Sequence, residues 1–107
     1  MKLIRIIIAL FVVTFGCVVG CNAEWITIDT YAYTSPYPGA ITASGHIPFV
    51  GGVACNLAPL GTRILIDGNW YVINDRSGTP NIVDIYFDTY EECIEYGIQT
   101  KRVFIER

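Results

Sequence analysis

The amino-acid sequence predicts a small, mainly β domain that closes into a barrel and carries one short helix. About six short segments rich in β-branched and aromatic residues follow one another, separated by turns built from glycine and proline. One segment near the C-terminal end has the capping pattern of a helix. The length of 107 residues allows a single domain. Short strands joined by glycine and proline loops are typical of a compact β-barrel.

The first 21 residues have the features of a secretory signal. Lys2 and Arg5 form a basic start, and the apolar run Ile6–Val13 follows. The uncharged stretch Ile6–Cys21 is short for a membrane-spanning helix, which needs roughly 20 residues. We therefore predict a signal peptide over residues 1–21 and one exported domain over residues 22–107.

Two cleavage patterns overlap at the end of this leader. Val18-Val19-Gly20-Cys21 is similar to the lipobox of bacterial lipoproteins, in which the cysteine is lipidated and becomes the new N-terminus. Cys21-Asn22-Ala23 also satisfies the small-x-small rule of ordinary signal peptidase. We favour lipidation of Cys21, which predicts a periplasmic or outer-membrane lipoprotein held to the membrane by its lipid. Secretion without a lipid and an uncleaved anchor are the alternatives.

The strands are expected in a regular order along the domain. In the first, alternate residues from Ile26 to Ala32 form one apolar face and Asp29 lies on the other. Asp67-Gly68 predicts a hairpin between the third and fourth strands, because both residues tolerate positive φ. The six expected strands are residues 25–33, 53–55, 62–66, 70–73, 83–87 and 101–105.

The one predicted helix lies between the last two strands. Asp88 is the expected N-cap, Glu91 completes a pattern like a capping box, and Gly97 ends the helix. A helix of about two turns is not stable alone, so we expect Ile94 and Tyr96 to hold it against the barrel.

Two cysteines, Cys55 and Cys93, remain in the domain after the leader. In an oxidising compartment such a pair can form a disulfide, and we state this pairing as a hypothesis. Cys55 acting as a nucleophile with His46 as its base is a weaker alternative, since we expect His46 to be structural or solvated. The sequence has no C-x-x-C or H-x-x-x-H spacing, so we predict neither a metal site nor a cofactor.

Charge excludes one class of partner. Without Lys2 and Arg5, five basic side chains face ten acidic ones. An acidic surface repels phosphate backbones, so we expect no nucleic-acid partner.

Two aspartates lack a purely structural explanation. Asp75 ends the fourth strand, and Asp84 lies inside the apolar segment Ile82–Phe87. If Asp84 is partly buried, the loss of hydration raises its pKa, and a neighbouring Asp75 anion raises it further. Such an acid suits proton donation to a glycosidic oxygen. If strand alternation turns Asp84 to water instead, it is an ordinary surface charge.

Five segments of the chain carry a family resemblance. They are Ala32-Tyr33-Thr34, Thr42-Ala43-Ser44-Gly45, Pro59-Leu60-Gly61-Thr62, Asn74-Asp75-Arg76 and Ile82–Phe87. Together, over about Thr27 to Ile105, they resemble the 3D domain, a family named for three aspartates. Its fold is a six-stranded double-psi β-barrel, and it occurs in A-type lytic transglycosylases and in stationary-phase-survival and resuscitation proteins.

The resemblance implies cleavage of peptidoglycan glycan strands. Asp84 matches the catalytic aspartate of the family, and Asp75 matches a second aspartate that lines the same site. The family's substrate-binding loops correspond to Tyr33, Thr34, Thr42 and Ser44. Tyr31 or Trp70 offers a ring on which a sugar stacks, although we expect Trp70 in the core.

One departure from the family keeps a second function open. Asn56 stands where the family has its first aspartate; as an asparagine it can hydrogen-bond the substrate, so we count it among the substrate-binding candidates, but it neither carries charge nor transfers a proton. The loop that follows Asn56 and the loop between Asp75 and Asp84 are also shorter than in the family. The alternative is therefore a barrel that binds glycan strands without cleaving them, similar to expansin and rare-lipoprotein-A barrels.

Overall fold

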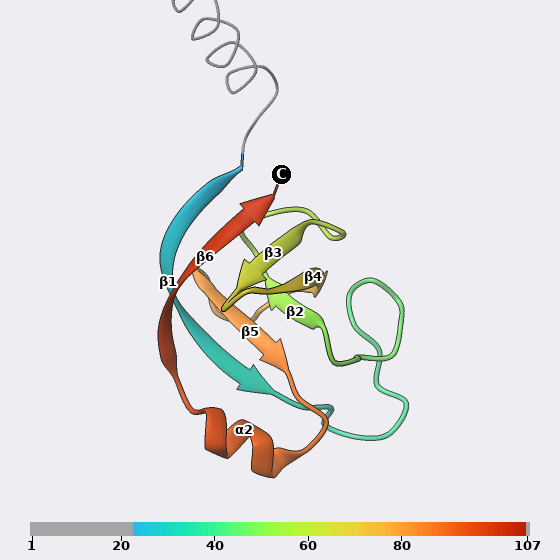
Figure 1. The fold of residues 1–107 in the computed structure, drawn as a ribbon. Coiled ribbons are helices and arrows are strands. Elements are labelled where there is room, and N and C mark those ends of the chain that lie inside the picture. Colours follow the sequence, from blue (N-terminus) through green and yellow to red (C-terminus); the bar gives the residue numbers. More distant parts are fainter. Residues whose placement is uncertain (1–22, 107) are drawn as a thin grey trace, which may run out of the picture.

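The computed structural model describes residues 23–106, which form a closed six-stranded β-barrel with one short helix (Figure 1). The predicted signal peptide and the lipidation site Cys21 lie outside the described residues. The predicted fold class is confirmed, and every predicted strand agrees with an observed one to within two residues at each end. The elements are β1 (Glu24–Tyr33), β2 (Gly52–Cys55), β3 (Arg63–Ile66), β4 (Asn69–Asp75), β5 (Ile82–Tyr86), α2 (Tyr90–Tyr96) and β6 (Gln99–Glu106).

The barrel closes in the strand order β1-β5-β2-β4-β3-β6, with β6 pairing back onto β1. The pairs β1–β5 and β2–β4 are parallel, and the other four pairs are antiparallel. Full closure leaves no strand edge open to pair with another chain. It also places β2, a short strand, between β4 and β5, which together carry both candidate aspartates.

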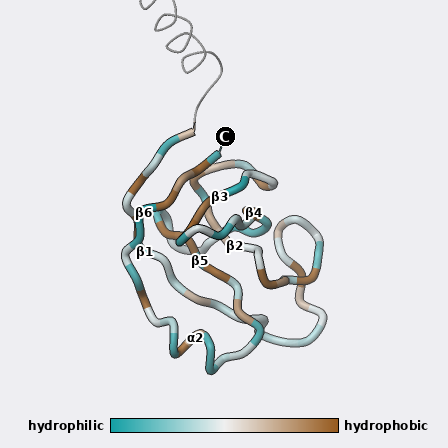
Figure 2. Tube along the Cα trace, in the orientation of Figure 1, coloured by the Kyte–Doolittle hydropathy of each residue, from teal (hydrophilic) through white to brown (hydrophobic). Residues whose placement is uncertain are grey.

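Alternation along the strands fills the barrel with small aliphatic side chains. In β1, Ile28 and Thr30 are buried while Asp29 is exposed and accepts a hydrogen bond from Thr100 Oγ1 at 2.7 Å, as the alternation predicts. Figure 2 shows hydrophobic stretches, in brown, along strands of the barrel, alternating with hydrophilic ones. The side chains with no more than 2% exposure include Val53, Cys55, Ile64, Ile66, Ile73, Val83, Val103 and Ile105.

The predicted hairpin turn is confirmed. Asp67 and Gly68 both have positive φ, at 50° and 79°, between β3 and β4. The Asp67 carboxylate also pairs with Lys101 Nζ of β6 at 2.6 Å, which ties the turn to the neighbouring strand.

The helix begins one residue later than predicted. Thr89 is its N-cap, and its partner in the capping box is Glu92, whereas Asp88 lies outside the cap. Gly97 ends the helix with φ 67°, as predicted. Tyr96 packs against the barrel core, whereas Ile94, two residues away and on a different side of the helix, is 63% exposed, so the prediction that Ile94 packs was wrong. Within residues 23–106, no helix is long and apolar enough to cross a membrane.

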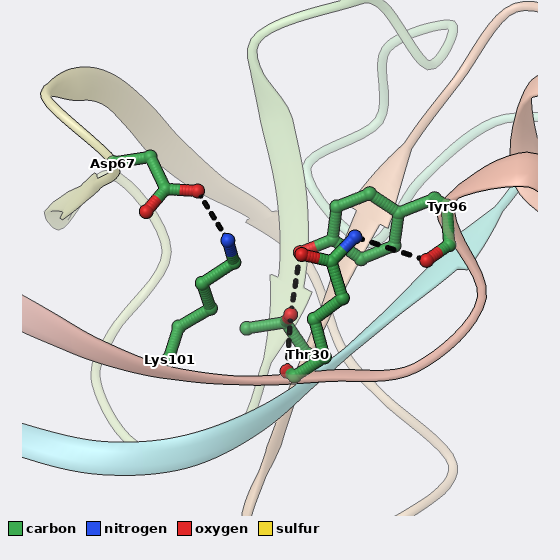
Figure 3. A network of polar contacts seen from close by, with 5 residues as sticks. Thr30, Asp67, Tyr96 and Lys101 are labelled. Atoms are coloured by element: carbon green, nitrogen blue, oxygen red, sulfur yellow. Dashed lines mark hydrogen bonds and ion pairs between the residues drawn. The ribbon is translucent and has the colours of Figure 1, made fainter.

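A polar network fixes α2 to the barrel (Figure 3). The Tyr96 hydroxyl lies 2.5 Å from Thr30 Oγ1, which itself donates to the carbonyl of Gln99 at 2.7 Å. The Gln99 amide donates back to the carbonyl of Tyr96 at 3.0 Å. These bonds satisfy Thr30, a fully buried hydroxyl, so the network also closes this end of the core.

No disulfide joins Cys55 and Cys93, contrary to the hypothesis from the sequence. Cys55 ends β2 with its sulfur in the barrel core, where it accepts a hydrogen bond from the Leu57 N–H at 3.5 Å. Cys93 is partly exposed on α2. Burial, and then the charges of Asp84 and Glu92, raise the pKa of the Cys93 thiol. The helix is therefore held by the Tyr96 contacts and not by a covalent bond.

Candidate functional site

Strand register brings the two candidate carboxylates to either side of one small residue. Ala54 of β2 lies opposite Asp75 of β4 and also opposite Asp84 of β5. Its neighbours in β2 point into the core, so Ala54 and its partners project from the outer face of the barrel. Two strand spacings separate the aspartate Cα atoms, about 10 Å. Ala54 is itself only 4% exposed, so its methyl group is covered although it lies on the outer side of β2.

A β-bulge at Asn74 gives Asp75 this orientation. Val53 lies opposite Ile73, but the next residue, Ala54, lies opposite Asp75, so Asn74 is the extra residue. Without the bulge, Asn74 would lie opposite Ala54. The Asp75 side chain would then point to the other face of the strand, towards the core. Bulges commonly redirect a side chain in this way next to functional sites.

Asp84 is partly exposed, yet its Oδ1 is buried and has no hydrogen-bond partner. Burial is the main cause that raises the pKa of Asp84, and the nearby charge of Asp75 adds to it. This carboxyl group therefore keeps its proton to higher pH than an ordinary aspartate.

Asp75 has a different environment. Its Oδ1 accepts hydrogen bonds from the Ala43 N–H at 2.9 Å and from the Arg76 N–H at 2.8 Å. One carboxyl oxygen of Asp75 therefore satisfies two backbone donors. The two acids are thus held differently, one satisfied by backbone donors and one with an unpartnered oxygen.

Tyr33 completes the cluster from the end of β1. It lies opposite Tyr86 of β5, and the two rings pack edge to face with centroids 5.6 Å apart. Its hydroxyl is buried without a hydrogen-bond partner. Burial, and then the charges of Asp75 and Asp84, raise the pKa of Tyr33 well above its ordinary value. The hydroxyl therefore stays neutral and is a hydrogen-bond donor beside both acids.

The loop between β1 and β2 folds against the same cluster. The Ser44 N–H donates to the carbonyl of Asn74 at 3.1 Å, one residue from the bond that Ala43 makes to Asp75. The buried Thr42 hydroxyl donates to the carbonyl of His46 and lies 2.7 Å from Ser44 Oγ. Thr42 therefore holds the loop together, while Ser44 is partly exposed at its edge.

Two further predicted site residues, Thr34 and Asn56, are less directly connected to the two carboxylates. Thr34 follows Tyr33 and is partly exposed. Asn56 uses its whole side-chain amide on Ser77, donating to the carbonyl at 2.8 Å and accepting from the N–H at 3.0 Å. Arg76 reinforces this link, since its Nη1 donates to the carbonyls of Cys55 and Ala58 at 2.7 Å. These side chains hold the loop after β2 against the loop after β4.

Sequence reasoning assigned no role to Asn74, although it is a notable feature of the site. Its side chain is 5% exposed, and neither polar atom of the amide has a partner. The amide packs on Gly52, where an added Cβ would come within 2.3 Å of Asn74 Nδ2. Gly52 is the first residue of β2 and directly follows Gly51, so two adjacent glycines mark this close approach in the sequence.

Trp70 and one surface hollow do not belong to this cluster. Trp70 is 44% exposed on β4 near the hairpin, so its expected core position was wrong. Tyr31, by contrast, lies opposite Asp84 and is partly exposed.

A hollow of about 380 Å³ has neither carboxylate in its lining, which consists of Ile26, Thr27, Ile28, Asp29, Leu57, Asn81 and Thr100. In the described part of the chain, no three His, Cys, Asp or Glu side chains gather as a metal site.

The chain matches no known family, no curated protein and no solved structure. Similarity therefore identifies neither a family nor an activity for this barrel.

Proposed function

We propose that this protein is an exported cell-wall enzyme that cleaves peptidoglycan glycan strands, in the manner of a lytic transglycosylase, with Asp84 as its acid and base. One observation carries the proposal. The Asp84 carboxyl group has a buried, unpartnered oxygen and a raised pKa beside a second acid. An acid whose pKa is raised keeps its proton to higher pH than an ordinary aspartate, which suits it to protonate a leaving oxygen.

The proposed reaction needs only one acid. Asp84 donates its proton to the oxygen between muramic acid and glucosamine as that glycosidic bond breaks. The 6-hydroxyl of the same muramic sugar then bonds to the oxocarbenium-like carbon and gives its proton to the Asp84 carboxylate. Asp84 ends protonated, no water is consumed, and the product is an anhydro sugar. Ordinary glycosidases need a second carboxylate for water or for a covalent intermediate.

The neighbouring groups have roles that fit this chemistry. The Asp75 carboxylate helps to keep Asp84 protonated, and its negative charge favours the positive charge that develops on the sugar. The partly exposed Ser44 hydroxyl is available to bond a sugar hydroxyl group, whereas the buried Tyr33 hydroxyl needs a small rearrangement to reach one. Tyr31, opposite Asp84, offers an aromatic face on the same side of the sheet.

Digestion of purified sacculi tests the proposal. The full-length protein is expected to release muropeptides with anhydro ends, which mass spectrometry identifies. Asp84→Asn removes the transferable proton, and general acid–base catalysis typically contributes about 10²–10⁴-fold to a rate, so this variant is expected to lose activity on that scale. Asp29→Asn is the matched control, because Asp29 is an exposed aspartate that bonds Thr100. Release by both wild type and Asp84→Asn, or by neither, contradicts the assignment of Asp84.

A second candidate is a barrel that binds glycan strands without cleaving them. The observation that favours it is Asn56, which replaces an acid of the 3D family and has both amide atoms bonded to Ser77. In this case wild type and Asp84→Asn sediment equally with sacculi and neither forms anhydro products. If neither protein sediments with sacculi, a structural lipoprotein without a glycan ligand is favoured.

We further propose that the domain is exported and held to a membrane by a lipid on Cys21. The basic start, the apolar run and the lipobox-like sequence support this location. Labelling cells with a fatty-acid analogue is expected to tag the protein, and Cys21→Ser is expected to abolish both the label and membrane retention. Retention of Cys21→Ser would instead favour an uncleaved anchor, and release of both forms would favour ordinary secretion.

A further inference from the structure

Four apolar side chains form one row across the outer face of β1, β6, β3 and β4. Trp25 lies opposite Phe104, Phe104 opposite Leu65, and Leu65 opposite Trp70. The ring centroids of Trp25 and Phe104 are 5.3 Å apart, and those of Phe104 and Trp70 are 6.4 Å apart. The row crosses three strand spacings, about 14 Å between the backbones of β1 and β4, and the rings converge over Phe104; we call these four side chains the aromatic row. Trp25 and Trp70, its two ends, remain 49% and 44% exposed.

The charges around the aromatic row are balanced, although the domain as a whole is acidic. Arg63 lies 4.3 Å from the Trp70 ring centre, and Arg102 lies 5.7 Å from the Trp25 ring centre. Arg63 also forms a two-pronged ion pair with Glu106, with N···O distances of 2.9 and 2.8 Å. With Glu24 at the start of β1, two basic and two acidic side chains lie near the row. This part of the surface therefore lacks the excess negative charge of the rest.

The aromatic row lies at the end of the barrel where the chain enters it. Figure 1 shows the start of β1 beside the C-terminal end of β6. Cys21 precedes Trp25 by four residues, and four extended residues span at most about 14 Å. The headgroup layer on each side of a bilayer is roughly 5–8 Å thick. A chain anchored at Cys21 therefore has too short a tether to carry Trp25 far from the membrane surface.

We propose that the aromatic row lies in the headgroup region of the membrane that holds Cys21, and that it orients the barrel on that surface. Tryptophan favours this region because its ring is apolar and its N–H group is polar. The inference rests on the proposed lipid anchor, but it does not depend on the proposed enzyme activity.

This orientation has a consequence for the carboxylate cluster. Tyr33 follows Trp25 by eight residues along β1, a path of up to about 26 Å at the rise of a β-strand. With Trp25 at the bilayer, Tyr33 and the neighbouring Asp84 are held away from the lipid, on the side from which a cell-wall polymer would approach.

Tryptophan fluorescence provides a direct test, because the chain contains only two tryptophans and both belong to the aromatic row. Lipidated full-length protein is placed in vesicles of phosphatidylethanolamine and phosphatidylglycerol, with or without bromine on the acyl chains near the headgroups. Trp25→Phe leaves Trp70, at the far end of the row from the tether, as the sole reporter. We expect the emission of Trp70 to shift to the blue on vesicles and to lose intensity when the lipid is brominated.

The outcomes distinguish a failure of this inference from a failure of the proposed lipid anchor or of the proposed enzyme activity. If the protein binds vesicles but its Trp70 emission is the same with and without brominated lipid, the proposed orientation is wrong and the proposed lipid anchor still stands. A protein that does not stay on vesicles overturns both. Trp70 emission that responds to sacculi and not to brominated lipid overturns the inference in favour of a glycan platform. Asp84→Asn is expected to behave like wild type here, whether or not the enzyme proposal holds.

Discussion

Removing the charge of Asp84 is expected to stabilise the folded barrel. In the unfolded chain this carboxylate is hydrated, whereas in the fold its Oδ1 is buried without a partner near Asp75. A buried polar atom without a partner costs about 1–3 kcal/mol, and more when it is charged. Asp84→Asn keeps the shape but leaves an amide in the same place, so we expect a gain of about 1–2 kcal/mol in the free energy of unfolding at pH 7. For a domain of this size, each kcal/mol raises Tm by about 4–8 °C.

The pH dependence of this gain follows from the direction of the pKa shift. Burial and Asp75 raise the folded-state pKa of Asp84 above the ordinary value of 3.8, so the folded state binds the proton more tightly than the unfolded state. The contribution of Asp84 to stability is therefore fully present below the ordinary pKa and is lost as pH rises through the raised pKa. Because asparagine does not titrate, the advantage of Asp84→Asn over wild type should grow across that window and level off above it.

Urea denaturation followed by far-UV circular dichroism at several pH values measures this difference. Asp29→Asn is the control, because this exposed carboxylate already accepts a hydrogen bond from Thr100 and its replacement should bring no gain. The reasoning is refuted if Asp84→Asn lowers stability at pH 7, or if its difference from wild type is the same at every pH.

Three further predictions concern the frame around the site. Gly52→Ala forces a Cβ into a buried amide and should cost about 1–3 kcal/mol in urea denaturation, whereas Gly78→Ala, which meets nothing within 4 Å, should change little. Thr89→Ala removes the helix N-cap and should cost about 1 kcal/mol, which Thr89→Ser should restore; equal loss in both variants would exclude the cap as the cause. In alkylation with mass-spectrometric mapping, Cys93 should react slowly because the pKa of its thiol is raised. Cys55 should react only when the protein unfolds, because its side chain is buried. Rapid labelling of Cys55 in the folded protein would show that it is not buried.

Local sequence patterns were sufficient for most of the strands. The alternation in β1 correctly placed Ile28 and Thr30 inside and Asp29 outside, because side chains in a strand change faces at every residue. Asp67-Gly68 correctly marked the hairpin, because few residue pairs adopt positive φ at two adjacent positions.

Predictions that depended on distant partners were less successful. The helix start was misplaced by one residue because Asp88 and Thr89 are both good caps, and only the bond between Thr89 and Glu92 distinguishes them. The expectation that both Ile94 and Tyr96 pack failed because residues two apart on a helix point to different sides, and only Tyr96 reaches Thr30. The Cys55–Cys93 pairing failed for a related reason, since spacing along a chain does not determine the direction of a side chain.

The candidate site shows the same division. The sequence by itself identified Asp75 and Asp84, because each is a carboxylate in an apolar strand or at its end, and the family resemblance added Tyr33. Only the tertiary structure decided that they meet, since this requires β2 to lie between β4 and β5 and Asn74 to form a bulge. Strand order and bulges depend on how the whole barrel closes, and closure is set by packing between segments far apart in the chain.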